Sequence, residues 1–196
     1  MPLYGLTGGI ATGKSYIDRC FVDLGTHLID ADLIAREVVE PDKPAWKKIV
    51  DYFGESILNP DRTLDRKKLG KRVFANREDL KRLESFIHPE VFNRENELVR
   101  EIRDKDPDAI IVVDAALMIE SGSYKRFDKV ILVVVEESIQ LERLMNRDGI
   151  SKEEAIQKIS SQMPQSEKRK YADYIIDTSR TREESKSQVE ELFQKL

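Results

Sequence analysis

A glycine-rich loop near the start of the chain constrains its fold more than any other feature of the sequence. Residues 8–15, GGIATGKS, match the pattern G-x-x-x-x-G-K-[ST] at every fixed position. A short apolar segment, Leu3–Thr7, precedes the loop, and apolar residues spaced for one helical face follow it. Strand, glycine loop and helix in this order form the phosphate-binding unit of P-loop proteins, so the pattern predicts a nucleoside triphosphate site.

The residues of this loop have distinct expected parts in holding a triphosphate. Glycines let backbone N–H groups converge on phosphate oxygens, and the start of the following helix adds partial positive charge. The Lys14 side chain is long enough to reach the β- and γ-phosphates, and the Ser15 hydroxyl is a ligand for Mg²⁺. The residues predicted to contact the nucleotide, which the family resemblance described below implies is ATP, are Gly8, Gly9, Ile10, Ala11, Thr12, Gly13, Lys14, Ser15 and Tyr16.

Five short apolar segments predict the strands of one sheet. They are Leu3–Thr7, His27–Ile29, Ile110–Val113, Val130–Val135 and Tyr174–Ile176. Most are continuous apolar runs, which are typical of strands buried on both faces of a parallel sheet. Helical patterns alternate with them, so we expect an α/β fold with a doubly wound, five-stranded parallel sheet of the P-loop NTPase type.

The uneven spacing of these strands predicts inserted helical parts. Residues 33–105 contain no convincing strand but carry helical patterns, one opened by Pro44 and one with Pro89 in its first turn. Trp46 and Phe53 are expected in the core of this lobe. A second helical block, rich in cations, follows the fourth strand. We therefore expect a nucleotide-binding core of residues 1–32, 106–137 and 171–196, a helical acceptor lobe at 33–105 and a lid at 138–170.

Composition and charge argue against several classes of function. The net charge is −4 without a long basic tract, which disfavours nucleic acid as a partner. The longest aliphatic run, Val130–Val135, is far too short to cross a bilayer, and the chain enters its first predicted strand at once, so we expect neither a membrane segment nor a signal peptide. The single cysteine, Cys20, rules out an internal disulfide, fits a cytoplasmic location, and lies on an apolar helix face that favours packing.

Two carboxylates, Asp30 and Asp32, mark the end of the second predicted strand, where open α/β sheets place their ligand crevice. In an extended chain their side chains point in opposite directions, so one can face the crevice while the other caps the next helix. The residues alone leave open whether one is functional or both are caps. Arg36, one turn later, can pair with Asp32 or meet an anionic substrate.

Further candidate residues follow the third and fourth predicted strands. Asp114 occupies a place where P-loop proteins often hold Mg²⁺, directly or through water, although a strand-end cap is the alternative. Arg143 and Arg147 lie one helical turn apart, and one of them is expected to neutralise charge on the γ-phosphoryl group. Such cations also occur on solvated helix faces. His88, before Pro89, is interpreted from the residues alone as a loop histidine with local bonds.

Three classes of protein share a P-loop: small-molecule kinases, GTP-dependent switches and motor ATPases. A Ras-type switch needs D-x-x-G after the third strand and an N-K-x-D motif, but residues 114–117 are DAAL and no N-K-x-D occurs. A motor usually requires a larger chain or an interaction module. A compact core, an acceptor lobe and a cationic lid are what a kinase requires, because a lid excludes the water that would otherwise take the phosphoryl group.

Over nearly its whole length the chain resembles the dephospho-coenzyme A kinase family. The resemblance is carried by residues 5–10 with 13–15, 23–25, 29–32 with 35–39, 64–66, 73–74, 87–89, 114–120, 140–143 with 147–148, Gln162, 172–173 and 176–177. The sequence Asp-Ala-Asp at 30–32, followed by Arg36, is far more discriminating than the glycine loop.

This resemblance implies an ATP- and Mg²⁺-dependent kinase that phosphorylates the ribose 3′-hydroxyl of dephospho-CoA, the last step of coenzyme A synthesis. It implies that Asp32 accepts the hydroxyl proton and that Arg143 stabilises the transferring phosphoryl group. The helical lobe would bind the acceptor, with Arg36 and His88 near its pocket, while Asp114 is less diagnostic. The implied partners are small molecules, and we expect a monomer or a weak homo-oligomer.

The chain departs from the family pattern at five positions: Tyr16, Ala116, Lys158, Thr178 and Arg180. Tyr16 replaces a small hydroxyl residue beneath the loop, and Ala116 replaces a proline. Lys158 replaces an arginine and loses its bidentate geometry. Thr178 and Arg180 stand where Asn and Gly are typical near the adenine, so these two changes can alter nucleotide affinity or base preference.

Overall fold

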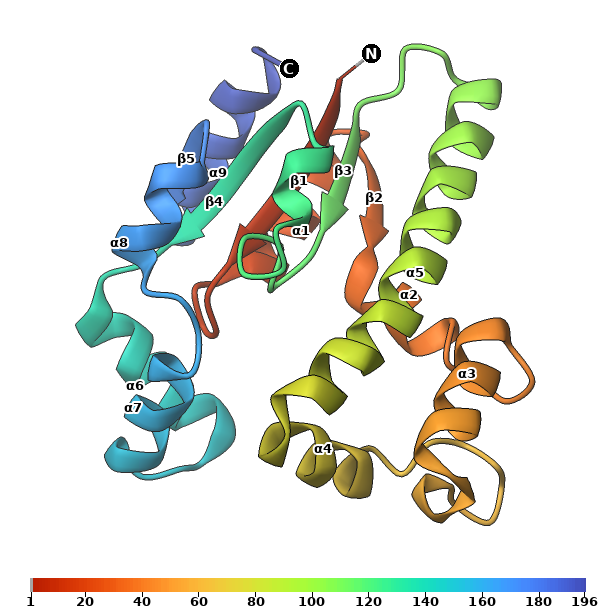
Figure 1. The fold of residues 1–196 in the computed structure, drawn as a ribbon. Helices are drawn as coiled ribbons and strands as arrows, with labels where there is room; N and C mark the ends of the chain where they lie inside the picture. Colours follow the sequence, from red (N-terminus) through yellow and green to blue (C-terminus); the bar gives the residue numbers. More distant parts are fainter. Residues whose placement is uncertain (1) are drawn as a thin grey trace. The chain divides into compact units, whose positions relative to one another are not determined.

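The computed structural model describes residues 2–196, so Met1, the first residue of the predicted core, lies outside the described residues. Its strands form one parallel sheet in the order β2-β3-β1-β4-β5 (Figure 1). The strands are β1 (Leu3–Gly8), β2 (His27–Asp30), β3 (Ile111–Asp114), β4 (Lys129–Val134) and β5 (Tyr174–Asp177). In this register Gly5 lies opposite Val113 on one side and Val130 on the other. The five-stranded parallel α/β sheet predicted from the apolar runs is confirmed.

Helices α1 (Lys14–Asp23) and α9 (Arg182–Phe193) pack together against the same face of this sheet (Figure 1). Their buried side chains, Ile17 and Phe21 from α1 and Val189 from α9, join Leu6 of β1 and Ile131 of β4 in one core cluster. Cys20 is buried in this cluster, as its place on the apolar helix face predicted. The sheet and this core hold the glycine loop at the junction of β1 and α1.

The chain forms two compact units: one comprises the residues up to Asp30 with Ile102–Leu196, and the other comprises Ala31–Glu101. The second unit contains α2 (Ala31–Glu37), α3 (Pro44–Phe53), α4 (Arg66–Ala75) and α5 (Arg77–Lys105) as far as Glu101. The segment predicted as a lid carries α6 (Glu137–Asp148), α7 (Lys152–Ser160) and α8 (Gln165–Lys168) and belongs to the first unit. Short 3₁₀ helices span Glu55–Ile57, Ser123–Arg126 and Arg169–Tyr171. The assignment of acceptor and lid roles to these segments remains a prediction.

The second unit has its own core around α3. Trp46, Ile49 and Phe53 are buried, which confirms that the two aromatic residues are core residues of this lobe. The indole N–H of Trp46 donates to the backbone carbonyl of Arg62 at 2.9 Å. Burial of the ring together with a satisfied indole N–H is the usual state of a core tryptophan.

The prediction that Pro89 lies in the first turn of a helix was wrong. Helix α5 begins at Arg77, and Pro89 lies in its interior. The Asn76 side chain starts the helix by accepting the backbone N–H of Glu78 at 2.9 Å. A proline inside a helix removes one hydrogen bond and bends the axis, and α5 changes direction along its length in Figure 1. The cap at Asn76 and the packing of a long helix therefore outweigh the local cost of the proline.

Local start signals elsewhere predicted helices correctly. Ser151 and Glu154 form a complete capping box at the start of α7, and Thr181 and Glu184 form one at α9.

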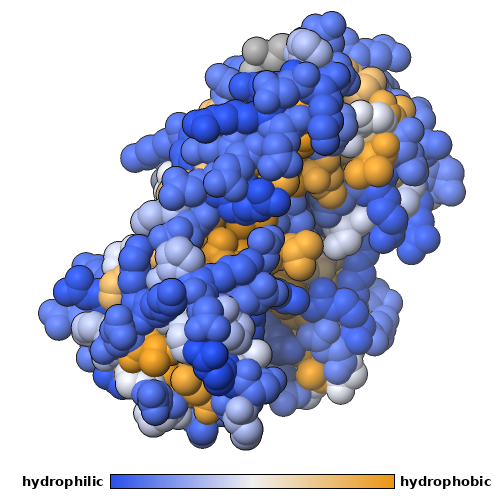
Figure 2. Space-filling model, turned by 90° about the vertical axis from the view of Figure 1, so that its right-hand side faces the viewer, coloured by the Kyte–Doolittle hydropathy of each residue, from blue (hydrophilic) through white to orange (hydrophobic). Residues whose placement is uncertain are grey.

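Hydrophilic residues cover most of the face drawn in Figure 2, and its apolar residues occur in small separate groups. From residue 2 to 196, no helix combines the length and the apolar composition that crossing a bilayer requires.

Candidate functional site

The glycine loop follows β1 at the carboxyl edge of the sheet. A Cβ atom at Gly8 would lie 2.8 Å from the Thr12 hydroxyl oxygen and 2.9 Å from the Val133 carbonyl oxygen, so only glycine fits there. Gly13 is the N-cap of α1 and has a φ of 86°, in the left-handed region that favours glycine. No side chain of the described residues caps α1. The first N–H groups of this helix therefore remain available to an anion.

Lys14, the first residue of α1, contacts the carboxylate of Asp114, the last residue of β3. Both side chains are largely buried, at 15% exposed for Lys14 and 7% for Asp114. The structure thus places the predicted phosphate-binding lysine beside the predicted Mg²⁺-associated carboxylate. An ammonium group has three N–H donors, so Lys14 keeps donors to offer a phosphate beside its hydrogen bond to Asp114.

Asp18 is a member of this charged group that sequence reasoning missed. Its carboxylate lies 3.9 Å from the Lys14 ammonium, one helical turn away. Burial, reinforced by the negative charge of Asp114, raises the pKa of Asp18 to about 7 even though Lys14 acts in the opposite direction. Its Oδ1 atom is buried and has no hydrogen-bond partner among the described residues. The signal in the sequence was the i,i+4 spacing of Lys14 and Asp18 on the first helix.

Thr178 connects the loop to Arg143 on α6. The Thr178 hydroxyl donates to the backbone carbonyl of Thr12 at 2.6 Å. The Arg143 guanidinium donates to the hydroxyl of Thr178 at 3.0 Å and to its carbonyl oxygen at 2.7 Å. A Cβ atom at Gly13 would lie 3.6 Å from this guanidinium, so Arg143 lies beside the loop. Sequence reasoning gave Thr178 a place near the adenine but missed its bond to the loop.

The second candidate arginine, Arg147, lies in a different environment. It pairs with Asp148 at 2.8 Å, and Lys158 contacts the same carboxylate at 2.7 Å. Hydrogen bonds from these two cations lower the pKa of Asp148 to about 2. Arg147 is therefore engaged by a carboxylate, whereas Arg143 donates to two uncharged oxygen atoms of Thr178.

A cavity of about 290 Å³ adjoins the loop on the side of Arg143. Its lining includes Gly13, Tyr16, Arg143, Thr178, Arg180 and Arg182. The Arg182 guanidinium lies 5.4 Å from the centre of the Tyr16 ring, within the range of a cation–π contact. The cavity thus brings together three of the positions at which the chain departs from the family pattern.

The remaining predicted residues, Asp32, Arg36 and His88, belong to the second unit. Asp32 is the second residue of α2 and is exposed. Arg36 lines a cavity of about 300 Å³ together with Arg66 and Leu64. Sequence reasoning gave Arg66 no role, although it ends a segment that carries the family resemblance.

The interpretation of His88 as a loop residue was wrong. His88 lies within α5 because this helix begins eleven residues earlier, at Arg77. It is half-buried, and its ring stacks on Phe92 with the ring centres 5.9 Å apart. The four-residue spacing of these rings is the usual spacing of a side-chain pair on one helical face.

Comparisons with known proteins agree on one family. Residues 3–184 match the family model for dephospho-CoA kinase. A dephospho-CoA kinase of Syntrophus aciditrophicus is 44% identical over 98% of this chain and 82% of its own length. One of Carboxydothermus hydrogenoformans is 44% identical over 100% of this chain and 94% of its own. The solved dephospho-CoA kinase of Campylobacter jejuni is 33% identical, with a TM-score of 0.72 over 98% of this chain and 96% of that chain.

Proposed function

The chain belongs to the dephospho-CoA kinase family, and we propose that its glycine loop holds MgATP while Asp32 activates the acceptor hydroxyl. The enzyme transfers the γ-phosphoryl group of ATP to the ribose 3′-hydroxyl of dephospho-CoA and releases ADP and coenzyme A. The observation that best supports ATP binding by the loop is the start of α1 at Gly13, which no side chain in the described part of the chain caps, with Lys14 as the next residue.

The loop supplies the groups that a triphosphate needs. Backbone N–H groups at the start of α1 face the phosphates, and Lys14 adds a positive charge. A bound γ-phosphate competes with Asp114 for the Lys14 ammonium, so we expect this contact to lengthen when ATP binds. The Lys14 ammonium then neutralises charge on the β- and γ-phosphates as the bond to ADP breaks.

The residues around Lys14 fit Mg²⁺. Ser15, directly after Lys14, is exposed, and Asp114 supplies a carboxylate in contact with that lysine. Hard oxygen donors suit Mg²⁺, which takes few protein ligands and keeps its remaining places for phosphate oxygens and water. Ser15 would hold the ion directly and Asp114 through water. Bound Mg²⁺ would supply charge neutralisation at the phosphate oxygens.

Asp32 carries the acceptor half of the proposal. It is exposed on α2, which begins directly after β2, and it lies in the Asp-Ala-Asp segment that most strongly carries the family resemblance. Its carboxylate accepts the proton of the 3′-hydroxyl as that oxygen forms its bond to the γ-phosphorus and the bond to ADP breaks. Arg36, with Arg66 in the same cavity, is suited to the diphosphate of the acceptor, and His88 belongs to the same lobe.

Arg143 is better placed than Arg147 to stabilise the transferring phosphoryl group. Its guanidinium donates to the hydroxyl and carbonyl oxygens of Thr178 beside the loop. Exchanging these uncharged acceptors for phosphate oxygens gives stronger, charge-assisted hydrogen bonds. Arg147 would first have to leave the carboxylate of Asp148. We therefore propose that Arg143 turns from Thr178 to the γ-phosphoryl group during transfer.

Acceptor-dependent release of ADP tests this function directly. Purified protein with MgATP is followed with and without dephospho-CoA, with adenosine as a second acceptor that lacks the diphosphate. We expect rapid ADP release only with dephospho-CoA and much slower release with adenosine. Slow release that is the same with and without any acceptor would contradict the proposal and favour a switch or a motor.

We also propose that the enzyme acts in the cytoplasm, on small molecules alone, as a monomer or a weak homo-oligomer. The net charge of −4 without a basic tract and the lone, buried Cys20 support this proposal. Light scattering coupled to size-exclusion chromatography tests the oligomeric state, and a stable assembly at micromolar concentration would contradict this part.

A further inference from the structure

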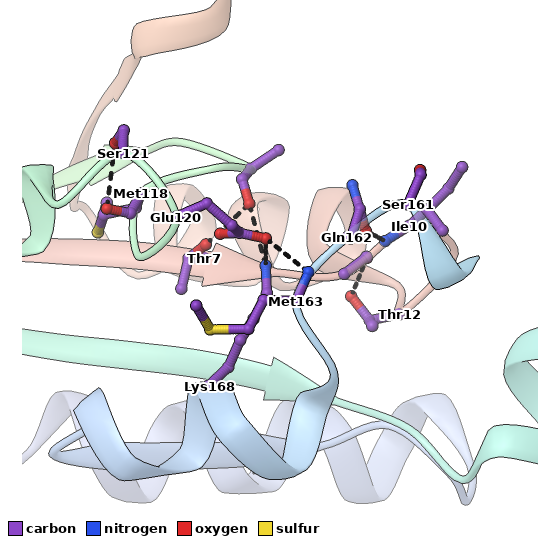
Figure 3. A network of polar contacts seen from close by, with 12 residues as sticks. Thr7, Ile10, Thr12, Met118, Glu120, Ser121, Ser161, Gln162, Met163 and Lys168 are labelled. Carbon is purple, nitrogen blue, oxygen red and sulfur yellow. Dashed lines mark hydrogen bonds and ion pairs between the residues drawn. The ribbon is translucent and has the colours of Figure 1, made fainter. Parts of the chain in front are cut away.

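Two glutamine side chains hold both backbone polar groups of one residue in the glycine loop. The side-chain oxygen of Gln162 accepts the backbone N–H of Ile10 at 2.8 Å. The side-chain amide of Gln140 donates to the backbone carbonyl of Ile10 at 2.7 Å. Figure 3 shows Gln162 and Ile10 side by side, with a dashed line between them. We call this pair of contacts the Ile10 clamp.

Gln140 is fixed in place by a third glutamine. The amide of Gln165 donates to the side-chain oxygen of Gln140 at 2.9 Å. Gln165 also accepts the backbone N–H of Val135 at 2.9 Å, directly after β4. Gln140 is only 3% exposed, and both ends of its amide have partners. A buried amide with both ends satisfied has one orientation, so the Ile10 carbonyl meets a rigid donor.

The segment that carries Gln162 is anchored on its other side. The backbone N–H of Met163 donates to a carboxylate oxygen of Glu120 at 3.2 Å, and the Lys168 ammonium contacts the same oxygen at 2.8 Å (Figure 3). Lys168 is fully buried. Breaking one partner of a buried ion pair leaves the other charge uncompensated, so this anchor resists opening. All of these residues belong to the first unit, and they hold Gln162 beside the loop.

The loop needs such support because its backbone is unfavourable next to the clamp. Ala11, the residue after Ile10, has a φ of 59°, which residues other than glycine rarely adopt. Such a conformation persists only where the surroundings impose it. The hydrogen bond from the Thr12 N–H to the Gly9 carbonyl, at 3.3 Å, closes the same turn. Fixing Ile10 within this turn therefore fixes the strained residue that follows it.

We propose that Gln140 and Gln162 are positioning residues for phosphoryl transfer, which keep the loop in its phosphate-binding conformation before ATP arrives. They act through Ile10 and are not catalytic residues. The proposal rests on the proposed function, because it takes the loop to be the ATP site. A loop ordered in advance loses less conformational freedom on binding, so loss of the clamp should weaken ATP binding more than it slows transfer.

The experiment compares Gln140→Ala, Gln162→Ala and the double variant with a matched control. The control is Gln188→Ala, because Gln188 makes the same pair of bonds to one residue, Asp177, at 2.9 and 2.8 Å. Asp177 ends the edge strand β5 and lies outside the loop. Steady-state kinetics give KM and kcat for ATP and KM for dephospho-CoA, and calorimetry gives the Kd of ADP.

We expect each single substitution in the clamp to raise KM for ATP and Kd for ADP about five- to tenfold, the effect of losing one buried hydrogen bond. KM for dephospho-CoA and kcat should change less than about threefold. In the double variant, the fold-increase in KM for ATP should be smaller than the product of the two single fold-increases, because both side chains hold the same residue. Gln188→Ala should lower the melting temperature without changing KM for ATP.

Two results would overturn the positioning role. One is a KM for ATP in Gln162→Ala and Gln140→Ala that stays within about twofold of the Gln188→Ala value. The other is an equal change in both KM values together with a lower melting temperature, which indicates a purely structural role. Lys14→Ala separates this proposal from the proposed function. If Lys14→Ala binds ADP normally, the loop is not the ATP site, whereas if only the clamp variants behave as wild type, the positioning role alone fails.

Discussion

Replacing Asp18 with asparagine should stabilise the protein at alkaline pH and have little effect in mild acid. Burial and the charge of Asp114 raise the pKa of Asp18 from 3.8 to about 7. An acid whose pKa is raised by folding binds its proton more tightly in the folded state. The free energy of unfolding therefore falls as pH rises from about 4 to about 7. Asparagine keeps the size of the side chain but removes this titration.

The size of the effect follows from the shift. Each pKa unit corresponds to about 1.4 kcal/mol, so a rise from 3.8 to about 7 gives an upper value of about 4 kcal/mol. This is a large part of the roughly 5–15 kcal/mol that stabilises a typical domain. The free energy of unfolding of Asp18→Asn should thus exceed that of wild type by up to about 4 kcal/mol at pH 8 and by little at pH 4.

Urea denaturation at several pH values between 4 and 8 measures this difference, because the titration of groups that do not interact with Asp18 cancels between the two proteins. Asp23→Asn is the matched control, since Asp23 is an exposed carboxylate at the end of the same helix. The effect of Asp18 is read as the change with pH that Asp18→Asn shows beyond that of Asp23→Asn. A difference between Asp18→Asn and wild type that is the same at pH 4 and pH 8 would refute the reasoning.

Three further predictions concern the site. Arg143→Met should lower kcat about 10²–10³-fold, whereas Arg147→Met should lower it less than about threefold. Of these two arginines, only Arg143 lies beside the loop. Equal losses of kcat in steady-state assays would contradict this prediction. Gly13→Ala should weaken ADP binding in calorimetry, whereas Gly149→Ala, also at a positive φ, should only lower stability; intact ADP binding in Gly13→Ala would count against the loop. Arg66→Met should raise KM for dephospho-CoA about tenfold and leave KM for ATP unchanged. Arg62→Met is the control, because Arg62 pairs with Asp42. An unchanged KM for dephospho-CoA in Arg66→Met would exclude a role of Arg66 in acceptor binding.

The parts of the fold that depend on local chemistry could be predicted from the sequence. Strands β1, β3 and β4 are continuous apolar runs because their consecutive residues are buried on both faces of the sheet. The helix starts at Ser151 and Thr181 carry complete capping boxes. The glycine loop was predictable because its spacing is fixed by the geometry of a phosphate. These signals need no knowledge of distant residues.

The parts that depend on tertiary contacts were missed. Pro89 suggested a helix start because its local preference is strong, but packing along α5 decides where that helix begins. The hydrogen bond between Ile10 and Gln162 spans 152 residues of sequence, and no local pattern marks it. The pKa of Asp18 depends on burial beside Asp114, which is 96 positions away along the chain. Contacts between residues so far apart in the sequence could be identified only from the folded structure.

Turnover of Asp32→Asn is the most direct measurement of whether the loop and this carboxylate serve one reaction. We predict that kcat falls by about 10²–10⁴-fold, as for the loss of a general base, while the Kd of ADP stays at the wild-type value. Asp30→Asn, two residues earlier, should retain most of the activity. Near-wild-type turnover in Asp32→Asn would contradict the assignment, and a large loss in Asp30→Asn alone would move it to the neighbouring carboxylate.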